Sequence, residues 1–201
     1  MIELLASAVA ARKSNATNGS NILVDTELLE IQGMLDRGQL KLTDATIFAT
    51  KEVSLNQRIR MFETQDVEAK GITNVTAAKL MRNQLVLVDR IRVLAATSPV
   101  TINGAAAVLG GLAYEGIRGH GGMVGGTITV RQANKNVNYQ VGLRVFDTTG
   151  RPDAVTGLYY LEAPIVLRPQ QLMEANLELG RAMPDRQAVR IELLGTQTSS
   201  F

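Results

Sequence analysis

The chain has no cysteine, no tryptophan and a single histidine, His120, among its 201 residues. Without cysteine it cannot form disulfides, zinc fingers, iron–sulfur sites or a thiol nucleophile. One histidine excludes every metal centre built from several imidazoles. Aromatic residues make up only 4% of the chain, which is few for a surface that stacks on bases or sugars. We therefore predict a protein that is not an enzyme, with no catalytic residues, no cofactor and no metal ion.

The chain also lacks a large excess of positive or negative charge. The chain carries 21 Lys and Arg against 19 Asp and Glu, and Arg12-Lys13 is its only adjacent basic pair. No interleaved basic and aromatic surface is visible, so we expect no sequence-specific binding of nucleic acid. No stretch approaches the roughly 18 apolar residues of a membrane span. The first apolar stretch follows Glu3 and no basic residue, an order that is wrong for a secretion signal.

Hydrophobic residues are plentiful, at 45% of the chain, and suffice for the core of one domain. Residues 25–36 place their leucines and isoleucine near helical spacing, whereas residues 14–21 are small and polar like a linker. We expect residues 1–44 to form an N-terminal arm with short helices, and residues 45–201 to form one domain.

From about residue 45 the hydrophobic residues recur at every second position. The clearest case is 137–145, where Val137, Tyr139, Val141, Leu143 and Val145 share one face of a predicted strand. Similar alternation predicts strands at 57–62, 85–94, 127–131, 173–179 and 189–193, with weaker candidates at 46–50, 157–161 and 165–168. Eight or nine such strands predict an all-β, antiparallel domain that is closed or built from two sheets.

A connection of about thirty residues, 97–126, interrupts this pattern, and loops of that length are uncommon in compact domains. Its first half predicts a short helix. Its glycine-rich second half predicts a mobile loop that includes Gly119, His120, Gly121 and Gly122. The glycine spacing does not match a phosphate-binding loop, and no Gly-x-Ser-x-Gly elbow accompanies the histidine. We therefore interpret His120 as a solvated or locally hydrogen-bonded side chain.

Arginines lie opposite the apolar faces of several predicted strands, namely Arg58, Arg60, Arg90, Arg92 and Arg190. Two interpretations stay open for them: a polar outer surface, or ion pairs between subunits. Together with Arg12 and Lys13 of the arm, they are the candidate assembly contacts.

The order of segments from Arg58 to Gly195 is familiar. It comprises Arg58-Ile-Arg-Met-Phe62, Gly71-Ile-Thr-Asn74, Asn83-Gln-Leu-Val-Leu-Val-Asp-Arg-Ile-Arg-Val93, Tyr160-Leu-Glu-Ala-Pro-Ile-Val-Leu-Arg-Pro169, Leu172-Met-Glu-Ala-Asn-Leu-Glu-Leu179 and Val189-Arg-Ile-Glu-Leu-Leu-Gly195. Over roughly residues 45–195, this arrangement resembles the jelly-roll capsid proteins of tailless icosahedral viruses, especially membrane-containing bacteriophages. The chain has room for a single barrel only.

The resemblance implies an antiparallel eight-stranded jelly-roll barrel or sandwich that acts as a structural virion protein. It implies a major capsid protein, made in the host cytoplasm, that assembles as trimers or pseudo-hexameric capsomers into an icosahedral shell. Its partners would be copies of itself and other virion proteins, with a weak contact of the arm to a membrane or genome. The alternative is a non-catalytic β-sandwich module that binds carbohydrate or a receptor, which the low aromatic content disfavours.

Overall fold

The computed structural model describes residues 33–34, 36–53, 58–82, 84–100, 106–132, 139–148, 154–181 and 186–200. The predicted linker at 14–21 and most of the predicted helix at 25–36 lie outside these residues, as do Arg12 and Lys13. What the structure describes is mostly antiparallel β-sheet, so the prediction of an all-β domain is confirmed.

The first sheet, sheet A, is built around three long strands. Its strands are β1 (Leu40–Val53), β9 (Gln187–Ser200) and β3 (Val86–Ala96) in that order, followed by β7 (Leu158–Leu167) and the short β4 (Tyr114–Glu115), which both pair with the far edge of β3. The β1–β9 pairing runs without a shift from Leu40↔Ser200 to Val53↔Gln187. β1 is the edge strand of sheet A, and an isolated bridge joins its outer side to Thr73 at Ala49.

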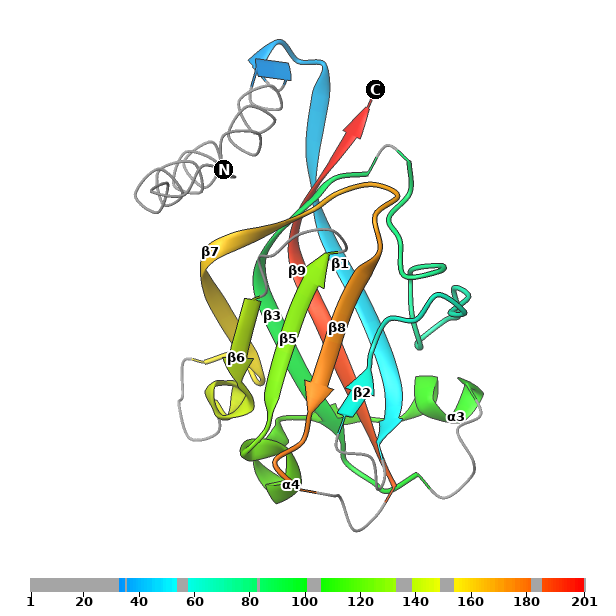
Figure 1. Cartoon of the computed structure of the whole chain (residues 1–201), viewed down its shortest axis with the longest axis vertical. Helices are drawn as coiled ribbons and strands as arrows, with labels where there is room; N and C mark the ends of the chain where they lie inside the picture. The colour runs from blue at the N-terminus through cyan, green and yellow to red at the C-terminus, as the bar shows by residue number, and fades with distance from the viewer. Residues whose placement is uncertain are drawn as a thin grey trace.

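The second sheet, sheet B, lies in front of sheet A in Figure 1. Its order is β2 (Arg58–Arg60), β8 (Met173–Glu178), β5 (Thr127–Gln132) and β6 (Tyr139–Gly142). Two short helices, α3 (Ala106–Gly111) and α4 (Gly121–Val124), lie at one end of the sheets. At the other end, the start of β1 and the end of β9 project past the remaining strands (Figure 1).

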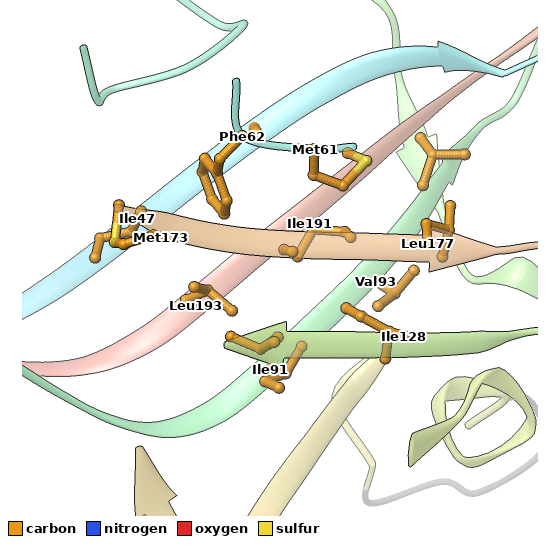
Figure 2. Packing of buried hydrophobic residues seen from close by; sticks show 14 of the residues in the cluster. Ile47, Met61, Phe62, Ile91, Val93, Ile128, Met173, Leu177, Ile191 and Leu193 are labelled. Atoms are coloured by element: carbon orange, nitrogen blue, oxygen red, sulfur yellow. The ribbon is translucent and has the colours of Figure 1, made fainter. Parts of the chain in front are cut away.

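The main core lies between the two sheets, because each strand turns alternate side chains inward. On β9, Val189, Ile191 and Leu193 are fully buried in it. Figure 2 shows Ile191 and Leu193 close to residues from β3, β5 and β8, among them Ile91, Val93, Ile128, Met173 and Leu177. The alternation read from the sequence thus marks the inward face of these strands.

Most predicted strands are confirmed. The candidates at 85–94, 127–131, 173–179 and 189–193 correspond to β3, β5, β8 and part of β9, and the weak one at 46–50 is the middle of β1. The candidates at 157–161 and 165–168 belong to the single strand β7. Its pairing with β3 shifts between Val88 and Arg90, beside a stretch of β7 that contains Pro164, which has no N–H to donate.

The predicted strand at 137–145 is wrong in its second half. β6 ends at Gly142, and residues Leu143–Phe146 form a 3₁₀ helix, η2. In such a helix, residues three apart lie on one side, so Leu143 and Phe146 are both buried while Val145 is 38% exposed. Val145 therefore does not share the buried face that the alternation predicts.

Two further expectations need correction. The strand expected at 57–62 covers only Arg58–Arg60, since Met61 and Phe62 are consecutive and both buried. The glycine-rich segment contains a 3₁₀ helix, η1 (Ile117–Gly119), and α4, and it places Ile117 and Met123 in the main core. This segment therefore contains short helices that pack on the core, and its mobility stays a prediction.

Candidate interaction surfaces

The outer face of sheet B is polar throughout the described residues. Its outward positions alternate with the core positions and are Arg58, Arg60, Thr127, Thr129, Arg131, Gln140, Glu174, Asn176 and Glu178, beside Gly142. Cross-strand ion pairs join Arg58 Nε to Glu178 Oε1 at 3.4 Å and Arg131 Nη2 to Glu174 Oε2 at 2.5 Å. Exposed pairs of this kind contribute about 0–1 kcal/mol to stability. The composition of this face is that of a solvated surface.

The outer face of sheet A is different, because apolar and charged side chains mix on it. Its outward apolar residues are Phe48, Leu87, Leu94, Leu158, Tyr160, Val166 and Leu194. Of these, Leu87, Leu94 and Val166 are buried, Phe48, Leu158 and Leu194 are half-buried, and Tyr160 is exposed. Tyr160 is 66% exposed, and the strand register places it opposite Arg90. A sheet face that combines aromatic, aliphatic and arginine side chains has the composition of protein interfaces.

A charged cluster crosses this face at Glu192, which is only 9% exposed. Arg190 Nε lies 2.7 Å from Glu192 Oε1, and Arg92 Nη1 lies 3.6 Å from Glu192 Oε2. The Arg190 guanidinium also stacks over the Phe48 ring, 4.1 Å from its centroid. The register aligns Phe48, Glu192 and Arg92 in one row across β1, β9 and β3.

The structure places the five candidate arginines of the strands on both outer faces. Arg58 and Arg60 lie on the polar face of sheet B, whereas Arg90, Arg92 and Arg190 lie on the mixed face of sheet A. Within the described residues, ion pairs with carboxylates of this same chain are formed by Arg58, Arg90, Arg92 and Arg190, including Arg90 Nε with Asp89 Oδ1 at 2.9 Å. Pairing of these arginines between subunits stays a prediction.

A feature that sequence analysis missed is a side chain that closes part of the β1 edge. The Phe48 N–H donates to Asn74 Oδ1 at 2.9 Å, and Asn74 Nδ2 donates to the Thr46 carbonyl at 2.5 Å. Next to it, the Thr50 N–H donates to the Ile72 carbonyl at 2.7 Å. The Asn74 amide thus takes the place of a neighbouring strand, a device that blunts sheet edges. No local pattern signals it, because the partners are 26 and 28 residues away.

His120 lies between η1 and α4, where its backbone N–H donates to the Ile117 carbonyl and its carbonyl accepts from the Met123 N–H. Its Nε2 atom is buried and has no hydrogen-bond partner. Burial lowers the pKa of His120 below its usual value, and the nearby Glu115 carboxylate opposes this shift. The expectation of a solvated or locally hydrogen-bonded imidazole therefore does not hold for Nε2.

The lowered pKa predicts a loss of stability in mild acid. The unfolded chain binds a proton on His120 at a higher pH than the folded chain, so the free energy of unfolding falls as pH drops below about 6.5. We expect His120→Gln to remove this part of the decline between about pH 7.5 and about pH 5.5. Urea unfolding at several pH values measures it, and NMR of the single imidazole reports the pKa directly. Identical pH profiles for the two proteins would contradict the prediction.

Neither a cluster of metal-ligating side chains nor a membrane-spanning helix is found in the part of the chain that the structure describes. Across residues 33–200, apart from the gaps given above, no group of three or more His, Asp or Glu side chains is placed to hold a metal ion. Within the same residues, no helix has the length and apolar character needed to cross a membrane.

Comparison with known proteins gives one structural neighbour to report. No protein-family model matches the chain, and no curated protein matches it. Among solved structures, it is similar to a chain in the acidic stable capsid structure of Helicobacter pylori bacteriophage KHP30, with 8% sequence identity and a TM-score of 0.33. The match covers 81% of this chain and 99% of the phage chain. A TM-score this low does not establish a common fold. The function is therefore inferred from the sheets and surfaces of this chain.

Proposed function

We propose that this protein is a non-enzymatic structural protein of a virus particle, which assembles with copies of itself into a shell. The proposal extends to a jelly-roll fold, to trimers or pseudo-hexameric capsomers, and to the role of major capsid protein of a bacteriophage. It places the protein in the virion after synthesis in the host cytoplasm.

The observation that carries the proposal is the nesting of the strand pairs. β1 pairs with β9, β2 with β8, β3 with β7 and β5 with β6, all antiparallel. A long hairpin that is rolled up into two sheets produces this order, and it is the order of the eight-stranded jelly roll, to which the two-residue β4 is an addition. The nesting supports a jelly roll independently of any likeness to another protein.

Jelly rolls serve as viral capsid proteins, lectins and cupins, and the composition favours the first. A cupin needs several histidine ligands, and this chain has one histidine. A sugar-binding surface favours aromatic platforms, and the chain has four Tyr, four Phe and no Trp. The mixed outer face of sheet A, with Tyr160 exposed beside Arg90, instead has the chemistry of a contact between proteins.

The remaining parts of the proposal concern the arm and the other partners. We assign residues 1–44 to an arm that contacts neighbouring subunits, or weakly contacts the membrane or genome inside the particle. Arg12 and Lys13 would supply the basic contacts of this arm. β1 begins at Leu40, so residues 40–44 of this arm already belong to sheet A.

The test is the assembly state of the full chain. We expect light scattering coupled to size exclusion to find trimers or larger species that grow with protein concentration, and electron microscopy to show regular particles or capsomers. Salt titration is the internal control, since contacts with exposed charges weaken as ionic strength rises. A monomer that persists at high concentration under every salt condition would overturn the proposal.

A further inference from the structure

Along the outer edge of β1, the backbone groups between Thr46 and Thr50 have hydrogen-bond partners, which closes this part of the edge. The part nearer the start of the strand is open, meaning that its outward backbone groups have no such partner among the described residues. The N–H groups of Phe48 and Thr50 point away from β9, since they donate to Asn74 and Ile72. Backbone groups alternate along a strand, and the β1–β9 register is unbroken. The N–H and C=O groups of Leu42 and Asp44 therefore also point away from β9, along the free edge of sheet A.

These outward groups have no partner in the described part of the chain. No hydrogen bond is formed by the backbone N–H or C=O of Leu42 or Asp44 at this edge. Asp44 is exposed and Leu42 is half-buried, so solvent reaches the edge here. A row of open donors and acceptors on an extended strand is a template for one more strand.

We propose that this open edge, from Leu42 to Asp44, is a strand-addition site where β1 pairs antiparallel with β1 of a second copy of this chain. The inference rests on the proposed assembly role and names one of its contacts. The resulting two-fold contact joins the A sheets of two subunits into one continuous sheet.

The edge is self-complementary, which is why a second copy is the occupant. A two-fold axis at Thr43 sets Leu42 of each copy opposite Asp44 of the other, so every open backbone donor and acceptor of both residues is satisfied at once. Thr43 then faces Thr43 of the second copy, a favourable cross-strand pair, and Lys41 faces Ala45. No like charges lie directly opposite each other. A symmetric contact of this kind closes on itself.

Beyond this segment the edge is unsuited to strand addition. From Thr46 to Thr50, the Asn74 side chain and the Ile72 carbonyl already occupy its donors and acceptors. The open part of β1 also lies at the projecting end of the molecule (Figure 1), where a second copy approaches without meeting α3 or α4.

The decisive variant is Leu42→Pro, with Leu42→Ala as its matched control. Proline has no N–H to donate, and it leaves the β1–β9 bonds intact because the Leu42 N–H points away from β9. We expect Leu42→Pro to weaken self-association by about tenfold or more, measured by sedimentation at several concentrations. Leu42→Ala keeps the N–H and is expected to change association only a few-fold. Asp44→Pro against Asp44→Ala repeats the comparison if the first variant folds poorly.

Hydrogen exchange gives a readout that does not depend on variants. The amides of Leu42 and Asp44 should exchange rapidly at low protein concentration and become protected as the chain associates, whereas the Phe48 amide, bonded to Asn74, should be protected throughout.

Three other results of these experiments would each contradict a different part of the argument. Unchanged association of both proline variants would overturn the edge contact and leave the shell role standing. A wild-type chain that never associates would overturn the shell role itself. A proline variant that melts at a lower temperature as a monomer, with unchanged association, would show that the chain's own residues use this edge and would also overturn the inference.

Discussion

Replacing Phe146 with alanine is expected to lower the free energy of unfolding by about 3–5 kcal/mol. The Phe146 side chain is fully buried in the main core, and its ring meets the Tyr159 ring edge-on, with 5.8 Å between centroids. The substitution removes this aromatic contact and leaves a cavity between η2 and β7.

Val145→Ala is the matched control for that variant. Val145 is the neighbouring residue of η2 but is 38% exposed, so its truncation should change stability by about 0.5 kcal/mol or less. Urea unfolding followed by circular dichroism measures both variants. Similar small losses for the two would mean that the 3₁₀ helix does not deliver Phe146 into the core.

Gly195→Ala is expected to cost about 3 kcal/mol, the upper end of the usual cost of overpacking. Gly195 pairs with Val88 on the central strand, where the β3–β9 register shifts. A Cβ at this position would collide with the Leu87 carbonyl oxygen and lie 2.9 Å from the Val88 Cα. These are backbone atoms, so the two strands would have to separate to admit a methyl group.

Gly119→Ala provides the comparison for the glycine variant. A Cβ at Gly119 meets no atom within 4 Å, and its φ is not positive. We expect a change of about 0.5 kcal/mol or less. Thermal unfolding of both variants separates steric crowding between strands from a general effect of replacing glycine. Equal melting temperatures would contradict the close β3–β9 approach.

Strand positions were largely predictable, because a half-buried strand leaves a period-two pattern that survives without knowledge of its neighbours. The prediction failed where that pattern continued past a change of structure. Residues 143–145 keep the alternation of β6, but the Leu143 N–H donates to the Gly126 carbonyl and the chain turns into η2. This partner is 17 positions earlier in the chain, so no local pattern reveals the turn.

The short helices of the glycine-rich segment were hidden in the sequence for a related reason. Glycine content indicates conformational freedom, yet Ile117 and Met123 bring enough apolar surface to dock the segment on the core. The chain also approaches itself closely here, since the Gly180 N–H donates to the Gly122 carbonyl. Glycines that read as a sign of mobility in the sequence are also suited to close packing.

The candidate interaction surfaces were predictable only as residue types. The sequence placed the arginines opposite apolar strand faces, but it did not show that Arg92 and Arg190 share Glu192 on one sheet while Arg58 lies on the other. Nor did it show Asn74 at the edge of β1. These groupings depend on strand register between distant segments, which hydrophobic periodicity does not encode.

By itself, the sequence determined that this chain folds as an antiparallel β domain without thiol or multi-histidine chemistry, since composition and alternation are local properties. Only the tertiary structure decided which strands are neighbours, which sheet face is mixed and which is polar, and where the edge of β1 stays open. The physical reason is that hydrogen bonds between strands and the burial of outward side chains depend on which remote segment lies alongside. Leu42 and Phe48 are both hydrophobic residues of β1. The Phe48 N–H has a partner in Asn74 and the Leu42 N–H has none within the described chain, a difference that depends only on what lies beside the strand.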